Sequence, residues 1–286
     1  MFKPIVIVIS GNELYLDYSK ALITSILVNS SSPSGVIFYL FTREQNAKII
    51  NELQAITSRY GSIIHELVLP SALYRELPAK DYKSLDAYSR LFAPRLLGRD
   101  YDRIIYLDID MIVSSDIQEL WDIDLHGHTL GAVRDIDYEK GEGISPLFNS
   151  GLLLIDTKKW HDKAIEEQVL QQIRYSEGGK VPLADQDDLN VVLKNDWFAL
   201  SPLWNAMCRS IYIGEIHYRD AHILHFNGGT IHKPDHYLCV NPGKVDYFHY
   251  LSLASVPPHR VYYLPVLVSR LFLFLQNLRN RFFKIQ

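Results

Sequence analysis

Two aspartates, Asp108 and Asp110, stand at the end of the mostly apolar run of residues 103–107. An apolar run that leads into two carboxylates is typical of a buried strand with an acidic carboxyl end. Hard divalent cations prefer carboxylate oxygens, so this stretch favours a metal site. The alternative is a turn after the strand, in which the carboxylates accept hydrogen bonds from backbone N–H groups. The stretch alone does not decide between the two.

The Asp-Ile-Asp triplet occurs three times, at residues 108–110, 122–124 and 135–137. Only the first follows a full apolar strand. Such a strand would be buried and would place the two carboxylates where little water screens their charge. We interpret residues 122–124 as a solvated cap or turn. The third triplet ends the weaker apolar run of residues 130–133. It could line the same crevice, but a turn is the favoured interpretation.

A third ligand for the cation must come from elsewhere in the chain, and His225 is the candidate. It lies in the apolar run of residues 222–226 and is followed by Asn227-Gly228-Gly229. Small residues at that place let a backbone approach a phosphate closely. A lone histidine among eleven is more often a structural group, and only this position sets His225 apart.

Three other polar stretches have both a structural and a binding interpretation. Residues 183–190 begin a helix with several acids in its first turn, which suits capping, but Gln186 and one carboxylate would also suit the hydroxyls of a sugar. Residues 149–151 are either a turn into a strand or a polar ledge under a ligand. Lys233 is either a solvated loop lysine or a partner for a phosphate.

Strand and helix patterns alternate along most of the chain. Strands are predicted at residues 5–9, 36–41, 63–69, 103–107, 130–133 and 152–155, and helices at residues 17–29, 43–60, 85–97, 159–174 and 187–194. The alternation predicts an α/β fold with a mostly parallel sheet flanked by helices. Ligands of such sheets bind outside the carboxyl ends of the strands, so we expect Gly11, Asp108 and Asp110 to face one crevice.

The totals describe an ordinary folded protein of one large or two small domains. The 286 residues are 48% hydrophobic and 22% charged, and the net charge of -4 with a pI near 6.3 argues against nucleic-acid binding. Cys208 and Cys239 are the only cysteines, which favours a reducing compartment and buried thiols. The apolar run near the N-terminus is too short to span a membrane, and we interpret it as the first strand.

The C-terminal segment is basic. Residues 270–286 contain four basic and no acidic side chains, which leaves -4 minus +4, or -8, on the rest of the chain. On a helix, four of its polar and basic residues fall on one face, opposite Leu and Phe; they are Arg270, Asn277, Arg281 and Lys284. Such a helix suits the surface of an anionic membrane, and the alternative is a helix docked on the domain.

Six motifs together resemble the retaining glycosyltransferases of family 8. This is the GT-A-fold group that contains glycogenin and the bacterial lipopolysaccharide α-galactosyl- and α-glucosyltransferases. The likeness covers nearly the whole chain in the order of the family. Its motifs are the N-terminal strand and turn, residues 88–91, 106–110, 148–155 and 185–187, and residues 225–228 with 233–234.

The resemblance implies a Rossmann-like, mixed and mostly parallel sheet in a catalytic domain of residues 1–260, followed by a membrane-association segment of residues 261–286. It implies transfer of galactose or glucose from a UDP-hexose donor to a glycan or glycolipid acceptor, in the synthesis of bacterial surface polysaccharide or lipopolysaccharide. The expected location is the cytoplasm, at the inner face of the membrane, with an anionic membrane surface as partner and no nucleic acid.

The resemblance also assigns roles to residues. Asp108, Asp110 and His225 would bind Mn²⁺ (or Mg²⁺), and Asp185 and Gln186 would be the catalytic pair. Lys233 would contact the leaving phosphate. The full set expected to bind the donor is Ile9, Ser10, Asn12, Arg90, Asp108, Ile109, Asn149, Ser150, Asp185, Gln186, His225, Gly228 and Lys233.

Two departures from the family pattern concern this set. The first turn of the family usually carries an acidic residue or pair near the nucleobase, whereas this turn reads Ser10-Gly11-Asn12-Glu13, which leaves the uridine contact open. The spacing from Gly228 to Lys233 is longer than usual, so His232 could share the role of Lys233.

Two other functions are alternatives to sugar transfer. A metal-dependent phosphohydrolase would need its aspartates early in the chain and a small hydroxylated residue where Ile112 stands. A catalytically degenerate sugar-nucleotide-binding protein is favoured only by the altered first turn. Retention could proceed by double displacement or by attack from the leaving-group face, and the acceptor loops at residues 135–147 and 205–220 have no recognisable pattern.

Overall fold

The computed structural model describes residues 3–11, 13–74, 77, 86–136, 146–176 and 185–254. Asn12, which is expected to bind the donor, and Asp137 lie outside these residues. The C-terminal segment and the expected domain boundary at residue 260 also lie outside them. Among the described residues, no helix is both long and apolar enough to cross a lipid bilayer.

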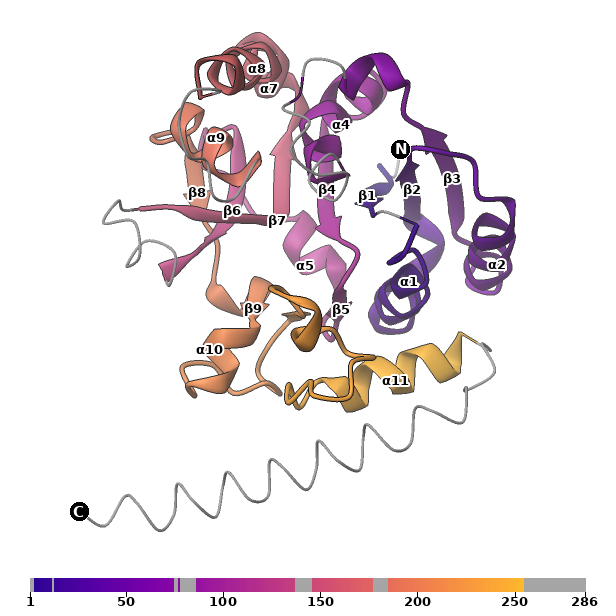
Figure 1. Ribbon diagram of the computed structural model, residues 1–286. Helices are drawn as coiled ribbons and strands as arrows, with labels where there is room; N and C mark the ends of the chain where they lie inside the picture. Colours follow the sequence, from indigo (N-terminus) through magenta and orange to yellow (C-terminus); the bar gives the residue numbers. More distant parts are fainter. Residues whose placement is uncertain are drawn as a thin grey trace, which may run out of the picture.

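A seven-stranded sheet forms the centre of the protein, with strand order β3-β2-β1-β4-β7-β6-β8 (Figure 1). Its strands are β1 (Ile5–Ser10), β2 (Val36–Thr42), β3 (Ile63–Val68), β4 (Arg103–Asp108), β6 (Leu130–Arg134), β7 (Phe148–Asp156) and β8 (Trp197–Ala199). Strand β7 runs antiparallel to both of its neighbours, and the other neighbouring pairs are parallel. The predicted mixed, mostly parallel sheet is confirmed.

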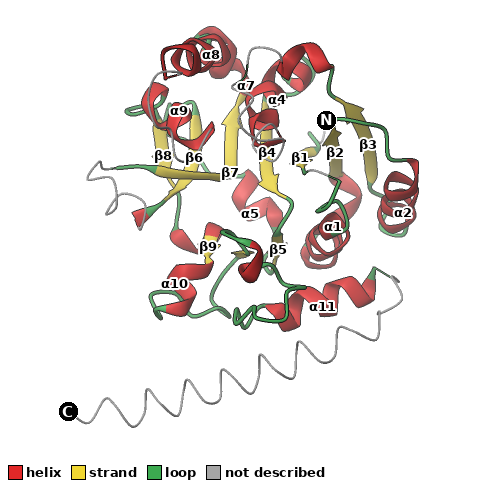
Figure 2. Ribbon diagram, viewed as in Figure 1, coloured by secondary structure: helices red, strands yellow, loops and turns green. Residues whose placement is uncertain are grey.

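The central strand β1 is buried along its whole length because helices cover both faces of the sheet (Figure 2). Ile5, Ile7 and Ile9 belong to a core shared with α1 (Tyr18–Asn29) and α2 (Ala47–Ser58). Val6 and Val8 belong to a second core shared with helices α4 (Ser89–Leu97) and α8 (Ile165–Ser176). A strand covered on both faces has no polar side, which explains its unbroken apolar run.

The other helices are α5 (Ile117–Trp121), α7 (Thr157–Asp162), α9 (Asp185–Val192), α10 (Cys208–Tyr212) and α11 (Lys244–Leu253). The helical pattern predicted for residues 159–174 is confirmed, but the chain divides it between two helices, α7 and α8. The break falls at Ala164, whose φ of 50° lies in the left-handed region. The predicted helix at residues 43–60 begins later, at Ala47, where the Asn46 side chain accepts a hydrogen bond from the N–H of Ile49.

A second sheet of three short strands, which was not predicted, lies beside the first. It consists of β5 (Met111–Val113), β10 (Ile223–His225) and β9 (Ala206–Met207), in the order β5-β10-β9. Strand β10 pairs with β5 in antiparallel register, so that His225 lies opposite Met111. The chain leaves the large sheet at Asp108 and enters the small one at Met111, and both aspartates therefore lie at the junction of the two sheets.

Residues 149–151 belong to strand β7, so their interpretation as a turn before a strand is wrong. The strand begins at Phe148, because Phe148 and Asn149 continue the pairing with β6 beyond a register shift between Gly131 and Val133. The antiparallel direction of β7 has a consequence for the site. The first residues of β7 lie at the edge of the sheet where β1 and β4 end.

Candidate functional site

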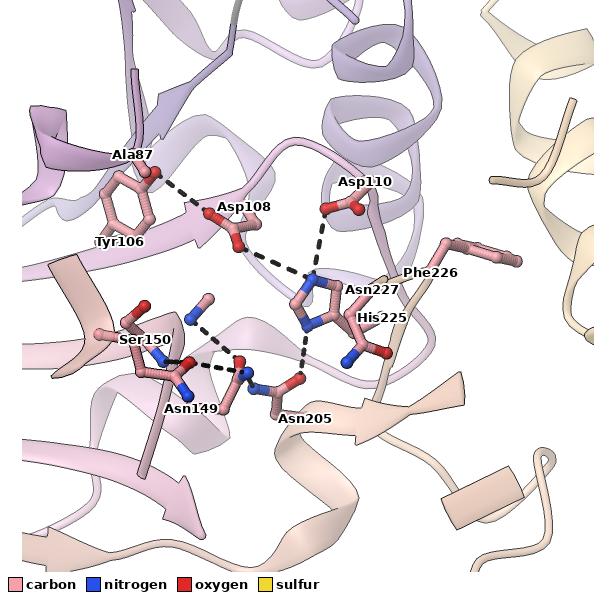
Figure 3. A network of polar contacts seen from close by, with 12 residues as sticks. Ala87, Tyr106, Asp108, Asp110, Asn149, Ser150, Asn205, His225, Phe226 and Asn227 are labelled. Carbon is pink, nitrogen blue, oxygen red and sulfur yellow. Dashed lines mark hydrogen bonds and ion pairs between the residues drawn. The ribbon is translucent and has the colours of Figure 1, made fainter. Parts of the chain in front are cut away.

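Asp108, Asp110 and His225 converge at the junction of the two sheets (Figure 3). The Nε2 atom of His225 lies 3.3 Å from an oxygen of Asp110 and 3.7 Å from an oxygen of Asp108. One ligand atom from each residue lies within 4.8 Å of the others. Two carboxylates and one imidazole at this spacing suit a divalent cation such as Mn²⁺ or Mg²⁺.

The close packing around these residues depends on Gly151. A Cβ atom at this position would lie 2.5 Å from Cε1 of His225 and 2.8 Å from Oδ2 of Asp108. No side chain fits in that space without displacing the imidazole or the carboxylate. The glycine that begins the apolar part of β7 therefore shapes the candidate metal site directly.

Asp110 is ionised in this setting. Its burial favours the neutral form, but the Lys233 ammonium and the His225 imidazole lower the pKa of the carboxyl below its ordinary value. The Lys233 ammonium donates to Oδ2 of Asp110 and, at 2.9 Å, to the carbonyl of Phe226. Lys233 thus reaches the site despite its longer spacing from Gly228. His232 lies instead against the hydroxyl of Tyr212, at 3.2 Å.

Arg90, on α4, joins three parts of the site. Its guanidinium lies 2.9 Å from Oδ1 of Asp108 and 3.0 Å from Oδ2 of Asp185, and it donates to the Ser150 hydroxyl at 2.7 Å. The charged group also lies 4.6 Å from the ring centre of Tyr106. Burial disfavours the charge of Arg90, but the two carboxylates raise the pKa of the guanidinium above its ordinary value.

One oxygen of Asp185, the first residue of α9, accepts no hydrogen bond from the residues that the structure describes. This atom, Oδ2, is close to Nε of Arg90, but the Nε–H group donates to the carbonyl of Ala87, at 2.8 Å. Among the described residues, no group donates a hydrogen bond to this buried oxygen. Buried acceptors are normally paired, and for this oxygen the described residues provide only the ion pair with Arg90.

The setting of Asp185 predicts a pH effect on stability. Burial raises the pKa of this carboxyl to about 6, since the pull of Arg90 offsets only part of the desolvation cost. The folded state therefore binds the proton more tightly than the unfolded state does. The tighter proton binding by Asp185 stabilises the folded state. This stabilisation is fully present below about pH 4 and is lost as the pH rises through about 6.

The expected result concerns the metal-free protein in urea denaturation. Between about pH 4 and pH 7, the free energy of unfolding of the wild type should fall by about 1–3 kcal/mol relative to that of Asp185→Asn. The variant is the control for every other titrating group. Parallel pH profiles of the two proteins would show that Asp185 has an ordinary pKa.

Asn149, Gln186 and Asp135 form a buried amide and carboxylate network beside these charges. Nδ2 of Asn149 donates to Oε1 of Gln186 at 3.1 Å and to Oδ2 of Asp135 at 3.2 Å. Nε2 of Gln186 donates to the same Asp135 oxygen at 3.3 Å. The interpretation of Asp135 as a turn residue is wrong, because its carboxylate holds two amides of the expected donor site in place.

A crevice at the carboxyl ends of β1 and β4 brings many of the expected residues together. It is lined by Ser10, Gly11, Tyr15, Asp86, Ala87, Arg90, Tyr106, Asp108, Ile109, Asp110, Gly228 and Lys233. The expectation that Gly11, Asp108 and Asp110 face one crevice is confirmed. Ile9 is fully buried in the core and is not among the residues that line the crevice. Asn149, Ser150, Asp185, Gln186 and His225 form the buried polar layer next to the crevice.

Several residues of the crevice were not expected. Tyr15 lies in a turn before α1, and Asp86 begins the 3₁₀ helix Asp86–Tyr88 before α4. The Asp86 carboxylate is paired with Arg43, with an oxygen at 2.8 Å from the Arg43 Nε. Asn205 accepts from or donates to His225 at 2.9 Å and had no motif around it. The aspartates at positions 122 and 124 have the expected structural roles, as the residue that ends α5 and as an acceptor for the N–H of His126.

The sheet order and the acidic crevice at the strand ends define an α/β protein of the GT-A type with a candidate metal site. The sequence profile of glycosyl transferase family 8 matches residues 6–239, and the chain belongs to this family. The resemblance inferred from the motifs is confirmed. The protein is therefore a family 8 glycosyltransferase with the fold expected for that family.

Two relatives and one solved structure illustrate the similarity. The chain is 29% identical over 266 residues to general stress protein A of Bacillus subtilis (strain 168), which covers 86% of this chain and 92% of the relative. It is 28% identical over 265 residues to lipopolysaccharide 1,2-glucosyltransferase of Escherichia coli (strain K12), and the match covers 85% of this chain and 75% of the relative. The galactosyltransferase LgtC, solved with donor and acceptor sugar analogs, shares the fold with a TM-score of 0.76 at 22% identity, over 89% of this chain and 98% of LgtC.

Proposed function

We propose that the protein is a metal-dependent, retaining hexosyltransferase that uses a UDP-sugar donor. The observation that supports this most strongly is the cluster of Asp108, Asp110 and His225 at the carboxyl ends of the central strands. Mn²⁺, or Mg²⁺, fits this ligand set, and when bound it would supply positive charge to the diphosphate of the donor. In this proposal the protein's own groups position the donor and complete the neutralisation of the leaving group.

Lys233 is the second positive charge for the diphosphate. Its ammonium lies beside Asp110, and the pKa of Lys233 is raised despite burial because of that carboxylate, so the group is charged at neutral pH. Gly228 lies in the same wall with a φ of 95°, a conformation that glycine adopts without strain. Groups placed in this way before the reaction stabilise the charge that develops on the leaving phosphate.

Asp185 and Arg90 suit the donor sugar. The oxygen of Asp185 that lacks a donor can accept a sugar hydroxyl, and the guanidinium of Arg90 holds that carboxylate in place. Hydroxyl groups are recognised by such fixed acceptors and donors. In this proposal Asn149 and Ser150 support the same pocket from β7.

The environment of Gln186 supports attack on the leaving-group face. Its Oε1 atom accepts hydrogen bonds from the backbone N–H of Ser150 and from Nδ2 of Asn149, both at 3.1 Å. An amide oxygen with both lone pairs engaged is a poor nucleophile. We therefore favour a reaction in which a phosphate oxygen of the donor takes the proton of the acceptor, over double displacement through Gln186.

Tyr15 offers an aromatic face at the crevice for a planar base such as uracil.

The names of the relatives support glucose or galactose as the sugar of the donor. They also support a glycan or glycolipid of the bacterial surface, including lipopolysaccharide, as the acceptor. A panel of oligosaccharide and lipid-linked acceptors would identify the acceptor.

The experiment for this function follows UDP release from UDP-glucose and UDP-galactose, with Mn²⁺, with Mg²⁺ and with EDTA. We expect release with one of the two donors and a divalent cation, and a loss of about 10²-fold or more with EDTA. Release of inorganic phosphate instead would indicate the phosphohydrolase. Donor binding without turnover, for any acceptor in the panel, would indicate a degenerate binding protein. Neither turnover nor binding, with GDP-sugars also tested, would refute the proposal.

The C-terminal segment, residues 261–286, is proposed to attach the catalytic domain to the cytoplasmic face of an anionic membrane. The basis is its sequence, in which basic and apolar residues occur without acids. Full-length protein should sediment with vesicles that contain anionic lipid and not with neutral ones, and deletion of residues 261–286 should leave it in the supernatant. Equal sedimentation of both forms would contradict this role.

A further inference from the structure

A chain of hydrogen bonds leads from the backbone of β7 to the candidate metal ligand His225. It begins at Gly151, whose backbone N–H lies 3.0 Å from Oδ1 of Asn149. A backbone N–H can only donate, so this contact determines which end of the Asn149 amide is the oxygen. The Nδ2 group of Asn149 then points to Gln186 and Asp135, where acceptors receive both of its hydrogens.

A second backbone N–H group determines the orientation of the Gln186 amide, which agrees with that of Asn149. The N–H of Ser150 lies 3.1 Å from Oε1 of Gln186, which must therefore be an acceptor, as its contact with Nδ2 of Asn149 requires. With these contacts, the amide of Asn149 uses both of its N–H groups, and its oxygen accepts from the N–H of Gly151. Its orientation is consequently fixed by the protein itself.

The orientation of the Asn149 amide determines that of the Asn205 amide, which contacts the histidine. The Oδ1 atom of Asn149 lies 2.9 Å from Nδ2 of Asn205, which must donate to it. The oxygen of Asn205 is then the atom that faces Nδ1 of His225, also at 2.9 Å (Figure 3). A ring nitrogen opposite a carbonyl oxygen has to carry the hydrogen, and in the neutral ring the lone pair is then on Nε2. That atom is the one that faces Asp108 and Asp110.

We propose that Asn205 is a positioning residue of the metal site. It holds the imidazole of His225 in the tautomer and orientation that present the Nε2 lone pair to the cation. Through Asn149, it also connects the metal site to the Gln186 and Asp135 pair beside the donor sugar. The inference rests on the proposed function, because it requires that Asp108, Asp110 and His225 bind a cation.

The fold supports this role in two ways. Asn205 ends the short 3₁₀ turn Pro202–Asn205, directly before β9, and β9 pairs with β10 so that Met207 lies opposite His225. Asn205 and His225 are thus held by the same small sheet. Both side chains are almost fully buried, at 1% and 3% exposed, so water cannot replace the amide.

The experiment measures Mn²⁺ affinity by calorimetry, without nucleotide, for the wild type and three variants. Asn205→Leu removes the acceptor, and we expect Mn²⁺ affinity to fall by about 10–100-fold. Asn205→Asp keeps an acceptor for the Nδ1–H group, and most of the affinity should return. Asn29→Leu is the matched control, since Asn29 joins α1 to β5 by its amide and touches no residue of this chain of contacts. Its Mn²⁺ affinity should equal that of the wild type.

The tautomer is tested separately by ¹⁵N NMR of the metal-free protein with labelled histidine, with His225→Asn used to assign the signals. The wild type should show His225 protonated at Nδ1. The Nε2-protonated tautomer, or unchanged Mn²⁺ affinity in Asn205→Leu, would overturn the inference. A purely structural role would reduce thermal stability in both Asn205 variants and leave Asp and Leu with equal affinity. Failure of the wild type to bind any divalent cation would overturn both the proposed function and the inference, whereas Mn²⁺ binding that Asn205→Leu leaves unchanged would overturn the inference alone.

Discussion

Asp110→Asn should abolish metal-dependent donor binding and reduce turnover by on the order of 10³-fold. The substitution keeps the size of the side chain but removes one of the two negative charges that face His225 Nε2. It also leaves the Lys233 ammonium without its carboxylate partner. Because Asp110 is ionised in the folded protein, the loss is that of a full charge at neutral pH. Calorimetry with Mn²⁺ and UDP, and UDP release, measure the two effects.

The chain contains a matched control for this variant. Asp124 also ends an Asp-Ile-Asp triplet, but its side chain is 77% exposed and accepts from the N–H of His126. Asp124→Asn should leave metal binding and turnover at wild-type values. A difference in metal binding between the Asp110 and Asp124 variants would show that the position of an aspartate in the fold, and not the triplet motif, determines whether it binds the metal. Unchanged Mn²⁺ affinity in Asp110→Asn would refute its assignment as a ligand.

Arg90→Met should lower the free energy of unfolding by about 3–5 kcal/mol at neutral pH. The Arg90 side chain is 5% exposed and lies between the carboxylates of Asp108 and Asp185, so its removal leaves the buried Asp185 carboxylate without its ion pair and takes one from the partly exposed Asp108. Arg90→Lys should recover only part of the loss, because an ammonium cannot reproduce the planar set of contacts to Asp108, Ser150 and the Tyr106 ring. Urea denaturation without metal measures the difference.

Arg99, which follows the same helix and is exposed, provides the comparison. Arg99→Met should change the free energy of unfolding by less than about 0.5 kcal/mol. The loss in Arg90→Met should shrink as the pH falls towards about 6, because without the guanidinium the pKa of Asp185 rises above its wild-type value and the carboxylate of the variant is neutralised at a higher pH. Equal stability of the Arg90 and Arg99 variants would show that the buried carboxylates do not depend on Arg90.

Long, regular patterns were enough to predict most of the large sheet. The continuous apolar runs of β1 and β4 and the alternation of strands with helices predict six of its seven strands and the crevice at their carboxyl ends. Strand β8 is three residues long, and the strands of the second sheet have two or three. Such strands are too short for a readable period, and their pairing depends on contacts between distant parts of the chain.

The site was predictable where a residue stands beside a strand end or a known motif. Asp108, Asp110 and His225 have such positions, and the structure brings them together. The role of Asp135 was not predicted, because its carboxylate accepts hydrogen bonds from Asn149 and Gln186, which are distant in sequence. Asn205 had no signal at all, because a single asparagine before a two-residue strand shows nothing of its partner. Its role follows only from the direction of hydrogen bonds in the folded chain.

The most direct test of the proposed function is a crystal structure of the protein with Mn²⁺ and UDP, with anomalous scattering used to locate the metal. A single manganese peak should lie between Asp108, Asp110 and His225 Nε2, with the diphosphate bound to the ion beside Lys233. A peak at any other place, or a diphosphate bound without manganese in a site that Mn²⁺ does not enter, would contradict the central claim.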